Sequence, residues 1–217
     1  MELVEIEASR IIFLTQVHRP AGQLYLPEAV AKLVARYSFA KFPSLDNILK
    51  TDEANVFSIG KFKDVQIYEL KTYSDGVIVS AQCDSDVLDE FLSDFYNWTE
   101  KELGLVPKIT AKPEKHYESQ LIVKSEKDLA AAIAPRHDLA GEFNKVWKRG
   151  KYPECEYVLS GATIDCDVSK FKGRRKPSRY MLDRRIGVPF EENVFYSAAP
   201  LTTKDHLAFL GAIERFA

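Results

Sequence analysis

The sequence contains no apolar run near the length of about 18 residues that a membrane-spanning helix needs. Its first residues, MELVEIEASR, are acidic, whereas a secretory signal starts with basic residues and continues with a long apolar stretch. Cysteine is scarce, because Cys83, Cys155 and Cys166 are the whole set. A small, odd number of cysteines favours reduced thiols in a reducing compartment. We therefore expect a soluble, cytoplasmic protein with no membrane partner.

The usual signatures of catalytic and metal sites are missing as well. None of the four histidines has a zinc-ligand spacing with another histidine or with a cysteine. The sequence has no CxxC, HExxH or GxSxG pattern and no complete phosphate-binding loop. His206 falls in the first turn of an expected helix, where a surface or capping role is the simplest interpretation. We expect no catalytic residue, no metal site and no cofactor, and these absences favour a non-catalytic protein over an enzyme without excluding the enzyme.

The overall composition is that of a folded chain. Hydrophobic residues make up 46% and charged residues 29% of the 217 residues, and the formal net charge is -2. These values exclude a disordered chain and give the whole molecule no attraction to nucleic acid. We find neither an internal repeat nor a low-complexity segment. The length suits a single domain over 1–217, and if this domain has two lobes, their boundary falls in the proline- and lysine-containing segment 105–116.

The clearest local pattern is a three-stranded meander that begins near residue 56. Asp75-Gly76 is a strong signal for a two-residue hairpin turn, and closing the chain there pairs Leu70 with Ala81. A second turn at 63–64 pairs Leu70 with Phe57. Both turns place the apolar side chains on the same face, as a half-buried sheet requires.

A long amphipathic helix follows the meander. Asp84 or Ser85 is a suitable N-cap and Gly104 a suitable end. The apolar positions between them recur at helical spacing, so we expect this stripe to cover the apolar face of the meander. The predicted fold class is α+β, with antiparallel hairpins and a three-stranded meander packed against amphipathic helices.

Two further hairpins are expected. One joins Glu2–Glu7 to Arg10–Val17 through Ala8-Ser9. The other turns at Ser160-Gly161 and places Cys155 opposite Cys166, within disulfide distance, although the expected compartment favours free thiols. The remaining expected elements are strands at 117–124 and 194–196, a short helix opened by a capping box at 125–128, and helices near 27–37, 139–147 and 202–216.

The most unusual segment is 170–185, KFKGRRKPSRYMLDRR, in which basic residues dominate and aromatic residues are interleaved. Such a mixture can neutralise phosphates and stack on bases, so the segment is a candidate nucleic-acid site. Two simpler interpretations are a solvated loop that leads into a strand near residue 179, and docking on an acidic surface of the same chain. The candidate nucleic-acid-binding residues are Lys170, Lys172, Arg174, Arg175, Lys176, Arg179, Tyr180, Arg184 and Arg185.

Acidic residues crowd the first half of the helix after the meander. Paired carboxylates there could hold a divalent metal or carry out acid–base chemistry. The simpler interpretation is that they favour the helix dipole and face solvent. These residues are Asp84, Asp86, Asp89, Glu90 and Asp94.

Three functions follow in order of preference. The first is a non-catalytic soluble binding or assembly protein, a subunit of a larger intracellular complex with a protein partner or a second copy of itself. The second is a nucleic-acid-associated protein that uses the segment 170–185. The third is a metal-dependent hydrolase or nuclease that uses the helix carboxylates.

Overall fold

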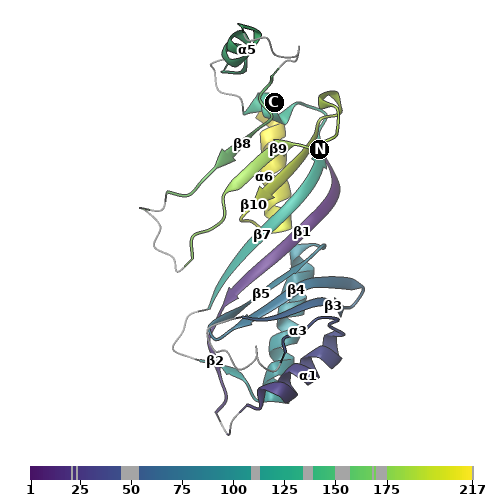
Figure 1. Cartoon of the computed structure of the whole chain (residues 1–217), viewed down its shortest axis with the longest axis vertical. Coiled ribbons are helices and arrows are strands. Elements are labelled where there is room, and N and C mark those ends of the chain that lie inside the picture. Colours follow the sequence, from purple (N-terminus) through teal and green to yellow (C-terminus); the bar gives the residue numbers. More distant parts are fainter. Residues whose placement is uncertain are drawn as a thin grey trace. The chain divides into compact units, whose positions relative to one another are not determined.

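The structure is a computed structural model of the chain, and its contacts divide the chain into two compact units (Figure 1). Unit 1 comprises Met1–Glu5, Gln120–Pro200 and Lys204–Ala217, and unit 2 comprises Ile6–Ser119 and Leu201–Thr203. The residues that the structure describes are 1–20, 22, 24–44, 54–108, 113–133, 139–149, 157–167, 169 and 175–216. No described helix has both the length and the apolarity needed to cross a membrane.

The α+β class is confirmed. Eight strands form one sheet in the order β3-β4-β5-β1-β7-β10-β9-β8, and β2 and β6 form a second, two-stranded sheet. The strands are β1 (Glu2–Leu14), β2 (Val17–His18), β3 (Asn55–Phe62), β4 (Val65–Tyr73), β5 (Gly76–Ala81), β6 (Val106–Pro107), β7 (Glu114–Lys124), β8 (Gly161–Ile164), β9 (Tyr180–Arg184) and β10 (Val194–Ala199). The helices are α1 (Leu26–Tyr37), α3 (Ser85–Leu103), α4 (Leu129–Ala132), α5 (Leu139–Arg149), the short 3-10 helix η2 (Phe190–Glu192) and α6 (Thr203–Phe216).

Apart from β2, β6 and η2, the described elements of the two halves of the chain follow a similar order, with one helix after β1 and two after β7. The first half runs from a long strand, β1, through α1 and the three strands β3, β4 and β5 to α3. The second half runs from β7 through α4 and α5 and the strands β8, β9 and β10 to α6. The sheet order is symmetric about the pair β1 and β7. This duplicated architecture has no counterpart in the sequence, where no repeat is visible.

Unit 2 is built around the helix that the sequence predicts most strongly. Asp84 is the N-cap of α3, where its side chain accepts a hydrogen bond from the backbone N–H of Asp86, and Gly104 ends the helix with a φ of 65°. The apolar stripe of α3 and the apolar face of the meander belong to one buried core, as predicted. Gly104 can adopt the left-handed conformation because it has no Cβ.

The meander differs from the prediction in its register. Leu70 pairs with Phe57 as predicted, but on its other side it pairs with Val79 instead of Ala81. The turn closes at 74–75, one residue earlier than the Asp75-Gly76 signal indicates. Because the shift between partners is two residues, Leu70 and Thr72 keep their predicted face, but a second register shift between Ile67 and Glu69 buries Ile67 and exposes Tyr68.

Both other predicted hairpins are wrong. The segment 2–14 is one continuous strand, β1, which pairs with β5. Ala8-Ser9 is a poor turn sequence, and Ser9 is buried opposite Ala81. Gly161 opens strand β8, which pairs with β9, so no turn forms at Ser160-Gly161. Cys155 lies outside the described residues, and Cys83 and Cys166 carry free thiols.

The first residues of α3 and α6 exchange hydrogen bonds. The backbone N–H of Ser85 donates to the Thr203 hydroxyl at 3.1 Å, and the backbone N–H of Thr203 donates to the Ser85 hydroxyl at the same distance. The hydroxyl of Ser9 on β1 lies 3.3 Å from that of Thr203. All three side chains are buried, so each hydroxyl satisfies a polar group that water cannot reach.

Strand β3 carries a strained residue beside a required glycine. Ile59 has a φ of 58° and falls out of the ladder between Ser58 and Gly60, which is unusual for a β-branched residue. At Gly60 the ring of Phe39 occupies the space that a side chain would need. An added Cβ would lie closer to a carbon of this ring than a normal van der Waals contact allows. Phe39 is itself buried, so the ring has little room to move.

We expect the change Gly60→Ala to lower the free energy of unfolding by about 1–3 kcal/mol, because a new methyl group overpacks the core at Phe39. Gly211→Ala is the matched control, since its Cβ would find an ordinary contact at 4.0 Å and the change favours α6. The control should be neutral or stabilising by up to about 1 kcal/mol. Urea unfolding of the two variants measures both effects, and a neutral Gly60→Ala would contradict the packing described here.

Candidate functional site

The helix-facing side of the sheet in unit 2 changes character from one row of side chains to the next. Across β1, β5, β4 and β3, one row is entirely apolar and buried. This row is Ile11, Val79, Leu70 and Phe57. The next row on the same face lies two residues away along each strand. It consists of Phe13, Val77, Thr72 and Asn55. The sheet therefore offers hydroxyl and amide groups to the helices at the β3–β4 end of that row.

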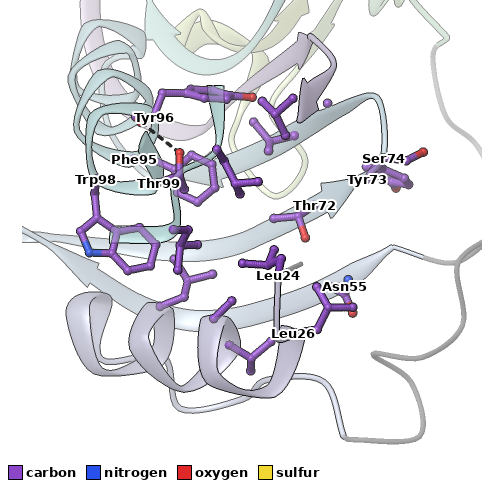
Figure 2. A pocket seen from close by; sticks show the side chains of 18 of the residues that line it. Leu24, Leu26, Asn55, Thr72, Tyr73, Ser74, Phe95, Tyr96, Trp98 and Thr99 are labelled. Atoms are coloured by element: carbon purple, nitrogen blue, oxygen red, sulfur yellow. Dashed lines mark hydrogen bonds between the residues drawn. The ribbon is translucent and has the colours of Figure 1, made fainter. Parts of the chain in front are cut away.

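A pocket of about 410 Å³ lies over this second row, between the sheet and the two helices of unit 2. α1 contributes Ala29 and Leu33, and α3 contributes Phe95 and Trp98. Figure 2 shows Leu24, from the segment before α1, reaching between the helix and the sheet. Interiors are normally packed without hollows of this size, and ligand pockets begin at about 300 Å³.

The two ends of the pocket differ. Asn55, Tyr73 and Ser74 gather at one end in Figure 2, and Trp98 lies at the other. Tyr73 is 43% exposed and Trp98 only 9%. The polar end is therefore the open one, and the aromatic end is closed.

A contact between α1 and α3 holds the closed end. The Arg36 guanidinium donates to both oxygens of Asp94, at 2.7 and 3.2 Å, and the Tyr37 hydroxyl donates to the same carboxylate at 2.6 Å. Arg36 also lies 5.9 Å from the centre of the Trp98 ring. Burial alone would raise the pKa of Asp94, but the hydrogen bonds from Tyr37 and Arg36 hold it below its usual value.

Tyr96 carries one of the pocket's hydroxyl groups that have no hydrogen-bond partner among the described residues. Its ring makes edge-to-face contacts with Phe13 and Phe95. Burial raises the pKa of its phenol. Among the described residues its hydroxyl forms no hydrogen bond, and Figure 2 shows this oxygen turned towards the end of the pocket where Asn55 lies.

The acidic residues of α3 do not form a shared site. Asp84 caps the helix, Asp89 accepts hydrogen bonds from Lys115 and Tyr117, and Glu90 pairs with Lys63. Asp94 belongs to the contact with α1. Among the described residues no group of three or more histidine, cysteine, aspartate or glutamate side chains is placed to hold a metal ion.

The basic segment is divided between exposed and structural residues. Lys170, Lys172 and Arg174 lie outside the described residues. Arg175, Lys176 and Arg179 are exposed, and Lys176 pairs with Asp165 at 3.0 Å. The rest of the segment, Tyr180, Arg184 and Arg185, is buried or half-buried.

Two of these buried residues serve the fold of unit 1. The Tyr180 ring packs edge-to-face on Phe209 of α6, so it offers no face to a base. Arg184 pairs with Asp128, and its side chain also donates to the backbone oxygen of Phe190. The exposed candidates for phosphate contacts within the described part of the segment are therefore Arg175, Lys176 and Arg179.

His206 is buried, which corrects the expected surface or capping role. Its Nε2 lies 2.8 Å from the Ser197 hydroxyl, and both residues are 0% exposed. That hydroxyl donates to the backbone oxygen of Met181 at 3.0 Å, so it accepts from Nε2–H. Burial lowers the pKa of His206 to about 4. A neutral histidine that donates to the serine cannot activate it as a nucleophile, and no substrate reaches a fully buried pair.

We expect the free energy of unfolding to fall by about 2 kcal/mol between pH 7.5 and pH 5, because the unfolded chain protonates His206 below its usual pKa and the folded chain does not. The change His206→Gln keeps an N–H donor for Ser197 and does not titrate, so this part of the pH dependence should disappear.

Urea unfolding at the two pH values measures the difference. The exposed His18, at the end of β2, supplies the control His18→Gln, which should keep the pH dependence of the unchanged protein. Equal pH dependence in His206→Gln and the unchanged protein would contradict the assignment.

Sequence reasoning missed the pocket. The presence of a pocket depends on the distance between the helices and the sheet. The periodicity of apolar residues in the sequence does not give this distance. One signal was present, since the polar Thr72 falls on the apolar face of the meander, where Asn55 is its neighbour on β3. A polar pair at the end of an apolar face indicates either solvent or a ligand.

Comparison of the chain with protein-family models, with curated proteins and with solved structures finds no match, so the pocket and its surroundings are the basis for assigning a function.

Proposed function

We propose that the protein is a non-catalytic binding protein of the cytoplasm, and that the pocket of unit 2 binds a small molecule. The observation that carries the proposal is the hollow of about 410 Å³ in an otherwise buried core, open at a polar end. A cavity of about 150 Å³ lined by leucine, isoleucine and phenylalanine binds benzene, so this one has room for a larger ligand. The free thiols of Cys83 and Cys166 support a reducing compartment.

The state of the reactive side chains supports binding without catalysis. Ser197 and His206 are buried, and the imidazole donates its hydrogen bond to the Ser197 hydroxyl. A histidine that acts as a base must instead accept the proton of the serine. Burial raises the pKa of the Cys83 thiol to about 11, which keeps it protonated and unreactive.

We expect the change Ala29→Phe to abolish ligand binding, because the new ring projects from α1 into the pocket and occupies it. Ala31→Phe is the matched control, since it places the same ring on an exposed position of the same helix. The measurement is the shift of the thermal unfolding midpoint across a library of small apolar compounds.

Compounds that stabilise the unchanged protein and Ala31→Phe should leave Ala29→Phe unaffected. If the stabilising compounds act equally on Ala29→Phe, they bind elsewhere and the pocket is not the site.

A second candidate is attachment to a partner protein through unit 1, as a subunit of a complex. The observation that favours it is apolar surface on and near α5, where Phe143 is 49% and Val146 is 63% exposed. Val158 and Ile164 are 47% and 58% exposed in the same unit. Exposed apolar side chains that gather in one region often mark interaction sites.

If unit 1 holds a partner, the change Val146→Glu should release it, because a carboxylate cannot be buried there without a counter-charge. Val4→Glu makes the same change at a comparably exposed valine of β1 and should leave the complex intact. Affinity purification of the tagged variants from native lysate, followed by quantification of the co-purified protein, distinguishes them. A partner retained equally by both variants would remove α5 from the interface.

A further inference from the structure

The lining of the pocket is polarised along its length. At the open end, Asn55 and Thr72 are direct cross-strand neighbours on the face that lines the pocket. The Tyr96 hydroxyl is turned towards the same end (Figure 2). At the closed end lie Trp98 and Leu33, both with little exposed surface. A ligand that fills this space would lie with a polar group at the open end and an apolar body at the closed end.

The lining carries no charge. Within the described part of the chain, every residue that lines the pocket is apolar or a neutral hydroxyl or amide residue. Arg36 and Asp94 lie on the two helices that form the pocket, but they bind each other and do not line it. An ionised group finds no counter-ion in this lining and loses its water wherever the pocket encloses it, which is strongly unfavourable. The lining therefore selects against carboxylates, phosphates and ammonium groups.

Tyr96 supplies a specific hydrogen bond. Its hydroxyl has no hydrogen-bond partner among the described residues, and it is not one of their fully buried polar atoms that lack a partner, so water can reach it. A ligand acceptor that replaces this water forms a directed hydrogen bond in its place. Because the raised pKa keeps the phenol protonated, its O–H can donate to an oxygen of the ligand.

Building on the proposed function, we propose that the ligand of this pocket is an uncharged amphiphile, with an apolar, ring-sized body against Trp98 and one neutral oxygen-bearing group that accepts a hydrogen bond from Tyr96. Alcohols, ketones and amides on an apolar skeleton belong to this class. Fatty acids, nucleotides and charged amines do not.

Three compounds with the same naphthalene ring test this assignment. 2-Acetylnaphthalene has a neutral acceptor, 2-ethylnaphthalene has a similar shape without one, and 2-naphthoate carries a charge. The full chain is used with the change Trp147→Phe, which leaves Trp98 as the single tryptophan, because the sequence has two. Binding is measured by the change in Trp98 emission and checked by calorimetry.

We expect 2-acetylnaphthalene to bind about 100-fold more tightly than 2-naphthoate, because the carboxylate would be buried unpaired. The change Tyr96→Phe should weaken the binding of 2-acetylnaphthalene relative to that of 2-ethylnaphthalene. We expect the ratio of their dissociation constants, ketone over hydrocarbon, to rise by about threefold or more. Tyr68→Phe is the matched control. The Tyr68 hydroxyl of β4 donates to Gln82, which follows β5, and Tyr68 does not line the pocket. Removal of this hydroxyl should leave the ratio unchanged.

The outcomes separate this inference from the proposed function. If 2-naphthoate binds as tightly as the ketone, or if Tyr96→Phe leaves the ratio unchanged, the assigned chemistry is overturned while the pocket remains a binding site. If none of the three compounds binds up to its solubility limit, the pocket is not a small-molecule site and both proposals fail. A dimer that excludes all three compounds and that Ala29→Phe dissociates would assign the pocket to a second copy of the chain.

Discussion

Unit 2 depends on the packing of the α3 stripe on the innermost row of the sheet. Phe91 and Leu88 of α3 and Leu70 and Val79 of the sheet are all 0% exposed. Each buried side chain of this kind contributes about 1.5–3 kcal/mol. α1 is placed by this packing, because Tyr37 contacts the Phe91 ring, with centroids 4.9 Å apart, and Asp94 binds the end of the helix. The pocket exists because α1 is anchored at that end, while the chain before it lies over the row of side chains that ends in Thr72 and Asn55.

The parts of unit 2 that the sequence predicts are those in which local signals agree. Asp84, the apolar stripe and Gly104 each indicate the same helix, and the structure places α3 within those limits. The meander was predicted with Phe57 and Leu70 on the correct face but with the wrong register between β4 and β5, because a shift of two residues leaves this part of the apolar pattern intact. The register error lies at Asp75-Gly76, a strong turn signal, whereas the wrong hairpin at the N-terminus lies where the signal was weak. Ala8-Ser9 lacks turn residues, and the long strand β1 gains more from pairing with β5 than from folding on itself.

The site was much harder to predict than the fold. The candidate sites 170–185 and the carboxylates of α3 were chosen from the sequence because they are rich in charged residues. In the structure Arg184, Asp89 and Asp94 form ion pairs with other residues of the chain. Their partners lie far away in the sequence, so no spacing rule reveals that they are engaged. The residues of the pocket are ordinary core types whose importance appears only when the helices are in place. His206 shows the same difficulty, since a polar residue in the first turn of a helix is normally exposed, and here α6 turns it inwards against Ser197.

The exchange of hydrogen bonds between Ser85 and Thr203 has a consequence for how the protein is made. The two residues are 118 positions apart, and the hydroxyl of each serves the backbone of the other. The ribosome synthesises all of α3 long before Thr203. The backbone N–H of Ser85 therefore has no Thr203 hydroxyl to bind until the intervening residues have been made. Unit 1 includes Met1–Glu5 in turn, so neither unit is a continuous piece of the chain. No single cut between Ser119 and Gln120 therefore releases either unit whole.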